Sequence, residues 1–206
     1  MREREIRLWT SSLVASYGRP RKAAELSKLK KAYSTKSYTL MIGIIAKDLK
    51  LDLKIRVGYV KSGGRGRPAW VEMPQPFPIY GSKAFKDSLA TIHIQNEFLR
   101  DVTFEAVVLM MVHELCHIVL NSTHHKFNQV EEVVDLASMF FGYGNVCIDG
   151  GNYSSFKMPE FNFEDLLYSD VTTLFKQGSS IEISEYELGY LSTEERLFAS
   201  RLLSLY

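Results

Sequence analysis

The first fifty residues show the spacing of apolar side chains that is typical of helices, with one apolar residue every three or four positions. In the first segment these residues are Ile6, Trp9, Leu13 and Tyr17. Gly18 can end this helix, because glycine is favoured just past a helix C-terminus. Pro20 is expected to begin a second helix, since proline is favoured at the first helical position. A third helix is expected over about residues 38–50.

The apolar pattern changes to a period of two after residue 50. The stretch "LKIRVGYV" (53–60) alternates apolar and polar residues, which is typical of a β-strand with one buried face. "AWVEM" (69–73) is a second candidate strand, and "LATIHIQ" (89–95) is a third. The glycine-rich stretch "KSGGRGRP" (61–68) is expected to be the loop between the first two. We therefore expect a small mixed sheet in the middle of the chain.

The second half of the chain returns to helical spacing. Asp101 or Thr103 can cap a long helix that contains "EAVVLMMVHELCHIVL" and that is apolar nearly all round, so it is expected to be central. A further helix is expected from about Asn128 to Gly142. The segment "STEERLFASRLLSLY" begins with a serine and a glutamate at capping-box spacing and is predicted to be the last helix. The fold class is therefore predicted to be α+β.

The central helix carries the sequence "HELCH", residues 113–117. Residues four apart on a helix lie one above the other, so His113 and His117 can offer two imidazole nitrogens to one metal ion. Glu114 is rotated from His113 by about 100° and can lie beside a water molecule that the metal activates. Buried histidines and glutamates without partners would be unfavourable. The motif therefore predicts a zinc site in which Glu114 is the general base.

A catalytic zinc ion takes three protein ligands and keeps one position open, so one more ligand is needed. One candidate is a histidine of the loop after the central helix, His124 or His125. The other is a glutamate of the next helix, Glu131 or Glu132. Asn128 and Glu131 are also spaced as a capping box, which gives Glu131 a purely structural alternative. The residues alone leave this choice open.

A His-Glu-x-x-His helix followed by Glu-x-x-x-Asp on the next helix resembles the gluzincins, the thermolysin-like zinc metallopeptidases. Glu131 and Asp135 have that Glu-to-Asp spacing. The resemblance implies three zinc ligands, which are His113, His117 and Glu131. It also implies that Glu114 is the general base and that Asp135 holds His113 in place. The function that it implies is hydrolysis of peptide bonds, and the fold is a compact zincin-like domain.

The "HELCH", "EEVVDLASMFFGYG" and "ELGYLSTEE" stretches together resemble a group of small uncharacterised bacterial metallopeptidase-like proteins. This resemblance covers about residues 85–206, and we expect a zincin-like domain over residues 51–206 with residues 1–50 as a basic helical region packed on it. SprT-like proteases use a third histidine beyond the motif, which "THHKF" (123–127) also allows. Metzincins would need a histidine at position 123, where this chain has Thr123.

A peptidase also needs groups that hold the substrate. In the families that the chain resembles, the strand before the site helix is an edge strand that pairs with extended peptide, so "ATIHIQ" (90–95) is expected to do so, with an ordinary core strand as the alternative. A hydrogen-bond donor must also stabilise the oxyanion of the tetrahedral intermediate. The candidates for that donor are Tyr143, Tyr153, Tyr190, His124 and His125. His93 and Cys116 are expected to be structural.

Composition places the chain among globular proteins. It has 206 residues, of which 46% are hydrophobic and 24% are charged, close to the average of such proteins. Two cysteines are too few for a disulfide scaffold, which favours a reducing, cytoplasmic setting. The N-terminal sequence "MREREIRLW" lacks the apolar core of a signal peptide, and the apolar runs are short for a bilayer, so no membrane association is expected.

The charge is divided unevenly along the chain. Residues 1–100 hold 20 of the 25 lysines and arginines but only 8 of the 24 acidic residues, although the whole chain has a net charge of +1. Opposite charges of the two halves can face each other or the solvent, or the basic half can bind nucleic acid. "GRGRP" (64–68) also contains the core of a minor-groove-binding motif, with a soluble turn as the alternative. A nucleic-acid-associated protease and a zinc-stabilised protein without catalysis therefore remain alternatives.

Overall fold

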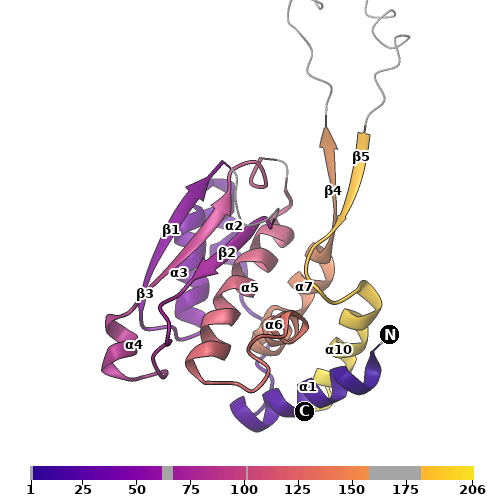
Figure 1. Ribbon diagram of the computed structural model, residues 1–206. Coiled ribbons are helices and arrows are strands. Elements are labelled where there is room, and N and C mark those ends of the chain that lie inside the picture. The colour runs from indigo at the N-terminus through magenta and orange to yellow at the C-terminus, as the bar shows by residue number, and fades with distance from the viewer. Residues whose placement is uncertain (1, 62–66, 101, 158–181) are drawn as a thin grey trace, which may run out of the picture.

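A three-stranded sheet and a shell of helices enclose one long buried helix, α5 (Figure 1). The computed structural model describes residues 2–61, 67–100, 102–157 and 182–206, with only the backbone for 152–157 and 182–187. The helices are α1 (Glu3–Tyr17), α2 (Ser27–Ser34), α3 (Tyr38–Asp48), α4 (Lys83–Asp87), α5 (Phe104–Ser122), α6 (Glu131–Ser138), α7 (Gly144–Gly151) and α10 (Thr193–Leu203), and a π-helical segment, Met139–Tyr143, joins α6 to α7. The strands are β1 (Lys54–Val60), β2 (Ala69–Glu72), β3 (Leu89–Gln95), β4 (Asn152–Lys157) and β5 (Glu182–Glu187). The fold is mixed α/β.

The main sheet has the strand order β1-β3-β2, in which β1 is parallel and β2 antiparallel to β3. The mixed sheet that the alternating pattern predicts is therefore present. Of the two alternatives for residues 90–95, the core strand is confirmed and the edge strand is wrong, because β3 is the central strand. Its alternate side chains Ala90, Ile92 and Ile94 are fully buried, which places one face of the strand in the core. The edge strand beside α5 is β2 instead.

The central helix α5 forms the middle of the core. The side chain of Thr103 caps it by accepting a hydrogen bond from the Ala106 amide at 3.3 Å, as one of the two alternatives predicted; Asp101 lies outside the described residues. The helix is long and apolar enough to cross a membrane, but 83% of its most apolar stretch is buried inside the molecule, as in the core helix of a soluble protein. This all-round burial explains why its sequence is apolar on every face.

The N-terminal helices contribute to the same core. α1 ends at Gly18 as predicted, with the Gly18 amide bonded to the Val14 oxygen at 2.9 Å and a backbone φ of +83°. Ile6 and Leu13 of α1 are fully buried, and so is Met41 of α3. α1 packs on α10, and α3 packs on α5. Residues 1–50 therefore share one hydrophobic core with the rest of the chain.

The prediction that Pro20 begins a helix is wrong, since α2 begins seven residues later. The segment before α2 runs instead beside the π-helical segment and donates backbone hydrogen bonds to it. The Arg21 amide donates to the Phe140 oxygen, and the Ala24 amide donates to the Gly142 oxygen, both at 2.9 Å. Gly142 has a φ of +103° at the point where the two segments meet. Contacts between positions more than a hundred residues apart have overridden the local helix signal here.

The helix after α5 also differs from its prediction. α6 begins at Glu131, three residues later than expected, whereas the predicted end at Gly142 coincides with a kink, because Gly142 has a non-helical φ of +103° before α7 begins at Gly144. Asn128 donates to the side chain of Asn121 at 3.2 Å, and the N-cap of α6 is Val130. The capping box of Asn128 with Glu131 is therefore not formed. The predicted capping box of Ser192 at the start of α10 is present.

Candidate metal centre

Two imidazoles of α5 and one carboxylate of α6 meet beside the sheet. The Nε2 atoms of His113 and His117 lie 3.2 Å and 3.1 Å from the same oxygen, Glu131 Oε2. One potential ligand atom from each residue lies within 4.8 Å of the other two. Among the residues that the structure describes, this is the group of histidine and carboxylate side chains that could hold a metal ion. It brings together the three ligands that the gluzincin resemblance implies.

Glu131 rather than its alternatives faces the histidine pair. The carboxylate of Glu132 pairs with Arg2 and not with the histidines. His124 is exposed and has a φ of +50° in the turn after α5. His125 is buried, and its Nε2 lies 3.0 Å from Ser12 Oγ of α1. None of these three belongs to the group.

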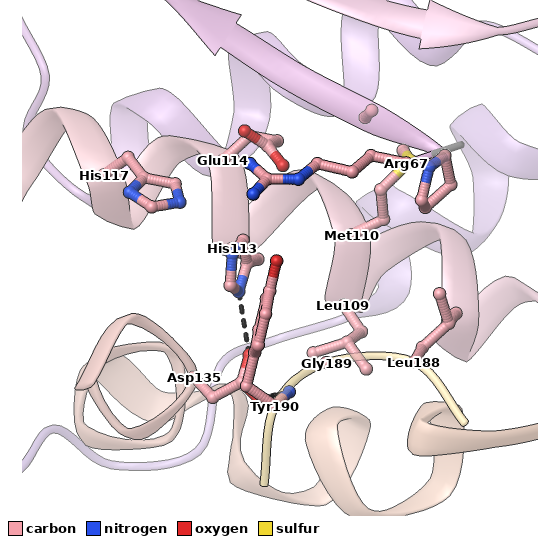
Figure 2. A pocket seen from close by; sticks show the side chains of 12 residues that line it. Arg67, Leu109, Met110, His113, Glu114, His117, Asp135, Leu188, Gly189 and Tyr190 are labelled. Atoms are coloured by element: carbon pink, nitrogen blue, oxygen red, sulfur yellow. Dashed lines mark hydrogen bonds and ion pairs between the residues drawn. The ribbon is translucent and has the colours of Figure 1, made fainter. Parts of the chain in front are cut away.

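Asp135 lies one helical turn after Glu131, as the predicted spacing requires. Its Oδ1 lies 2.7 Å from His113 Nδ1 (Figure 2). Because an ionised carboxylate only accepts hydrogen bonds, Nδ1 of His113 is the donor, and Nε2 is left to face the metal position. The second oxygen, Oδ2, accepts the backbone amides of Tyr190 at 2.5 Å and Leu191 at 3.0 Å.

Tyr190 was a candidate oxyanion donor, but the sequence did not predict that the backbone of the segment 188–191 supports Asp135. Gly189 has a φ of +89°, and a Cβ atom there would lie 2.6 Å from Asp135 Oδ2. Glycine is therefore required for the backbone to approach the carboxylate. The signal was the glycine just before Tyr190, but it is weak because many glycines mark ordinary turns.

Tyr190 covers one face of His113. The two rings stack with centroids 5.7 Å apart and an interplanar angle of 21°. Figure 2 shows the hydroxyl end of Tyr190 directed to the side of the pocket where Glu114 and Arg67 lie. Burial raises the pKa of the Tyr190 hydroxyl, so this group stays protonated and can donate a hydrogen bond.

The ionisable groups of the site stabilise one another. Burial alone would lower the pKa of His113, but hydrogen bonds with Asp135 and Glu131 raise it to about 10. The same hydrogen bonds with the two histidines hold the pKa of Glu131 far below its usual range. Burial raises the pKa of Glu114, and the nearby histidines oppose this rise. Glu131 thus faces the Nε2 atoms of both imidazoles, where a metal cation can take the place of a proton, while the Nδ1 proton of His113 stays with Asp135.

Two adjoining clefts flank the group along β2. Both are lined by Arg67, Glu114 and His117. The first has a volume of about 280 Å³, and its further lining includes the apolar side chains Leu109, Met110 and Leu188. The second has a volume of about 170 Å³, and its further lining includes Trp70, Asn121, Asn128 and Gln129. A groove with one apolar and one amide-rich half therefore crosses the candidate metal centre.

Arg67 lines both halves of this groove. Its Nη1 lies 3.6 Å from Glu131 Oε1, the carboxylate oxygen that does not face the histidines. The "GRGRP" stretch that contains this arginine predicts a turn or a nucleic-acid contact; residues 62–66 of that loop lie outside the described residues. The nucleic-acid role of the basic half stays a prediction.

Tyr143, His93 and Cys116 have partners outside the group. The hydroxyl of Tyr143 donates to Asp48 Oδ2 at 2.9 Å, away from the group, and the side chain of Tyr153 lies outside the described residues. His93 stacks on Trp70 with centroids 5.0 Å apart, which fits the expected structural role. Cys116 is buried, as expected, with its sulfur 3.5 Å from the Ser138 hydroxyl.

Comparisons with known proteins give this geometry no further context. No family model matches the chain, and neither the curated proteins nor the solved structures contain a significant match to it. The assignment of the site therefore rests on the residues themselves.

Proposed function

We propose that this protein is a zinc-dependent metallopeptidase. The observation that carries the proposal is the group of His113, His117 and Glu131, with Glu114 beside it in the groove. Two imidazole nitrogens and one carboxylate oxygen are the donor set that catalytic zinc takes in peptidases of this chemistry. Asp135 leaves the Nε2 atom of His113 available, as an orienting carboxylate does in zinc sites. The donor set and its support therefore fit zinc.

The number of donors favours a catalytic site over a purely structural one. Structural zinc sites are closed by four protein ligands, whereas catalytic sites have three. Among the described residues the group has three. When bound, zinc would polarise a water molecule and lower its pKa to roughly 7. Glu114 lines the groove next to both histidines and is the base that takes the proton from that water.

The substrate proposed for the groove is an extended peptide. β2 pairs with β3 on one side, and both clefts are lined by residues at or next to β2, such as Ala69 and Val71. A peptide can add to a free strand edge through its own backbone amides and carbonyls. The sequence suggested β3 as the strand that pairs with peptide, and we propose β2 instead.

Tyr190 is the group proposed to stabilise the oxyanion. Its hydroxyl is protonated and is directed into the pocket, while Tyr143 and His125 are held by partners elsewhere. Donation to the developing negative charge would strengthen in the transition state, which is the source of rate enhancement by such groups. The stacked His113 ring keeps the phenol in place.

The test compares two glutamates of α5. The protein is loaded with zinc, its metal content is measured, and cleavage of an unfolded protein substrate is followed. Glu114→Gln should keep zinc and lose about 100- to 10,000-fold in turnover, the range expected when a general base is removed. Glu105→Gln, in the first turn of the same helix, serves as the control and should keep full activity. Equal activity of the two variants, or no cleavage by zinc-loaded wild type, would reject the proposal.

A further inference from the structure

Arg2, the residue that precedes α1, contacts three segments that are distant in the sequence. Its Nε and Nη2 atoms donate to the two carboxylate oxygens of Glu195, each at 3.0 Å, and its backbone amide donates to the same carboxylate at 3.2 Å. Nη1 pairs with the carboxylate of Glu132. Nη2 also donates to the backbone oxygen of Tyr190 at 3.2 Å. The planar fork of the guanidinium therefore joins two carboxylates and one carbonyl.

Two of these partners adjoin the candidate metal centre. Glu132 directly follows the metal-facing Glu131 on α6. Tyr190 stacks on His113, and its amide binds Asp135. The third partner belongs to α10, which begins just after the segment 188–191. Arg2 thus connects the helix that supplies one ligand with the segment that supports another.

The first turn of α6 needs such an anchor. Its N-cap is Val130, whose oxygen accepts the Val133 amide at 2.9 Å, and within the described part of the chain no side chain caps the helix. The first amides of a helix have no partner within the helix, and helix ends open more easily than helix centres. Glu131 stands in this turn, so any opening would move its carboxylate away from the histidines. The pair of Glu132 with Arg2 restrains this turn.

We propose that Arg2 is a positioning residue of the metal centre, which fixes the first turn of α6 and the segment 188–191 relative to each other. It acts through Glu132 and through the carbonyl of Tyr190, and it touches neither metal nor substrate. The inference rests on the metal site that the proposed function requires, but not on the peptidase reaction.

The alternative is that Arg2 only ties α1 to α10. The chain offers a matched control for this, because Arg7 of α1 also contacts α10, with its guanidinium carbon 5.0 Å from the ring centre of Phe198. No contact of Arg7 reaches Glu132 or the segment 188–191 among the interactions described. Loss of Arg7 should weaken the packing of the two helices without altering the metal centre.

The test measures zinc affinity by competition with a chromophoric chelator, well below the melting temperature of each variant. Arg2→Ala should bind zinc about 10-fold more weakly, the lower end of the range for residues that support metal ligands. Arg2→Lys keeps the charge but loses the planar fork and should fall between wild type and Arg2→Ala. Arg7→Ala should bind zinc as wild type does, although its melting temperature falls. Equal zinc affinity of Arg2→Ala and Arg7→Ala would overturn the inference.

Hydrogen exchange of the metal-free protein gives a second readout that does not depend on zinc or on activity. Arg2→Ala should raise the exchange of amides in residues 131–135 and 188–191, and Arg7→Ala should not. Unchanged exchange in both segments would also overturn the inference. A wild-type protein that binds zinc but cleaves no peptide would reject the proposed function alone, because the zinc affinities of the Arg2 and Arg7 variants would still decide the role of Arg2.

Discussion

The chain contains two close pairs of histidines, and the structure uses them in opposite ways. His113 and His117 lie four residues apart on α5 and direct their Nε2 atoms to the same carboxylate oxygen. His124 and His125 are adjacent in the turn that follows, so their side chains diverge. His124 is exposed, and His125 is buried among residues of α1. The spacing relative to the helical repeat, and not the number of histidines, determines which pair can share a metal ion.

The hydrogen bonds of His113 and His125, the buried histidine of each pair, also distinguish a possible metal ligand from a structural residue. His113 donates from Nδ1 to Asp135, which leaves Nε2 for a metal ion. His125 accepts the Phe127 amide at Nδ1, at 3.3 Å, so its proton lies on Nε2, which faces Ser12 Oγ. Both ring nitrogens of His125 are therefore used by the fold. The Nε2 atom of His113 faces the carboxylate of Glu131, which can bind the same metal ion, whereas the Nε2 atom of His125 faces only the hydroxyl of Ser12.

The largest expected difference between the pairs is in zinc affinity. His113→Ala should weaken zinc binding by roughly 1,000-fold, because one of three ligands is lost from a binding free energy of about 10–16 kcal/mol. The combined His124→Ala and His125→Ala variant should bind zinc within about 2-fold of wild type, while losing stability because buried hydrogen bonds are lost. Zinc titrations against a competing chelator measure both. Loss of zinc in the double variant with retention in His113→Ala would reverse the comparison.

The identity of the third ligand can be tested on two neighbouring glutamates. Glu131→Gln should weaken zinc binding by roughly 100-fold, since a charged ligand is replaced by a weak one. Glu132→Gln should cost only a few-fold, because Glu132 acts through Arg2. The same chelator competition applies. If Glu131→Gln binds zinc as wild type does while the double histidine variant fails, a SprT-like histidine ligand replaces the gluzincin assignment.

Asp135 should have a smaller effect than the ligands, because it orients one of them. Asp135→Ala is expected to lower zinc affinity by about 10–100-fold. It also removes the acceptor of the Tyr190 and Leu191 amides, so the melting temperature should fall as well. Asp149→Ala, an exposed acid on α7, is the control for the loss of a negative charge. Equal zinc affinity of the two variants would remove Asp135 from the site.

The sequence predicts those parts of the fold and of the candidate site whose signals are local. The helical spacing of His113 and His117, and the spacing of Glu131 and Asp135, require only that each segment be helical. The alternation that predicted β3 is equally local. These features follow from periodicities of 3.6 and 2 residues, which a single segment carries in full.

The features that the sequence did not predict depend on distant segments. The position of β3 in the centre of the sheet depends on where β1 and β2 pair, which no single strand records. The irregular segment after Pro20 depends on backbone hydrogen bonds to residues 140–142. The support of Asp135 comes from backbone amides near Gly189, which leave almost no mark on residue type.

The smallest expected effect is on the pH dependence of stability, and it depends on the pKa of His125, the buried histidine of the second pair. The pKa of His125 is lowered by burial, and nearby Lys126 acts in the same direction, although the hydrogen bond with Ser12 opposes both. Protonation of Nδ1 would also break the hydrogen bond from the Phe127 amide. The pKa of His113 is shifted in the opposite direction by its carboxylates. The neutral form of His125 is therefore the one that the folded state favours.

A lowered pKa in the folded state means that the unfolded chain binds the proton of His125 more readily. The contribution of neutral His125 to stability is complete above its ordinary pKa of roughly 6.5 and is lost as pH falls below that value towards the lowered pKa of the folded state. The free energy of unfolding of wild type, measured with chelator present so that metal loss does not contribute, should therefore fall more steeply below pH 6.5 than that of His125→Gln. Other groups titrate alike in the two proteins and cancel in the difference. A difference that stays constant between pH 7.5 and 5 would show that His125 titrates normally, and its burial against Ser12 would then not explain why it is unsuited to bind a metal.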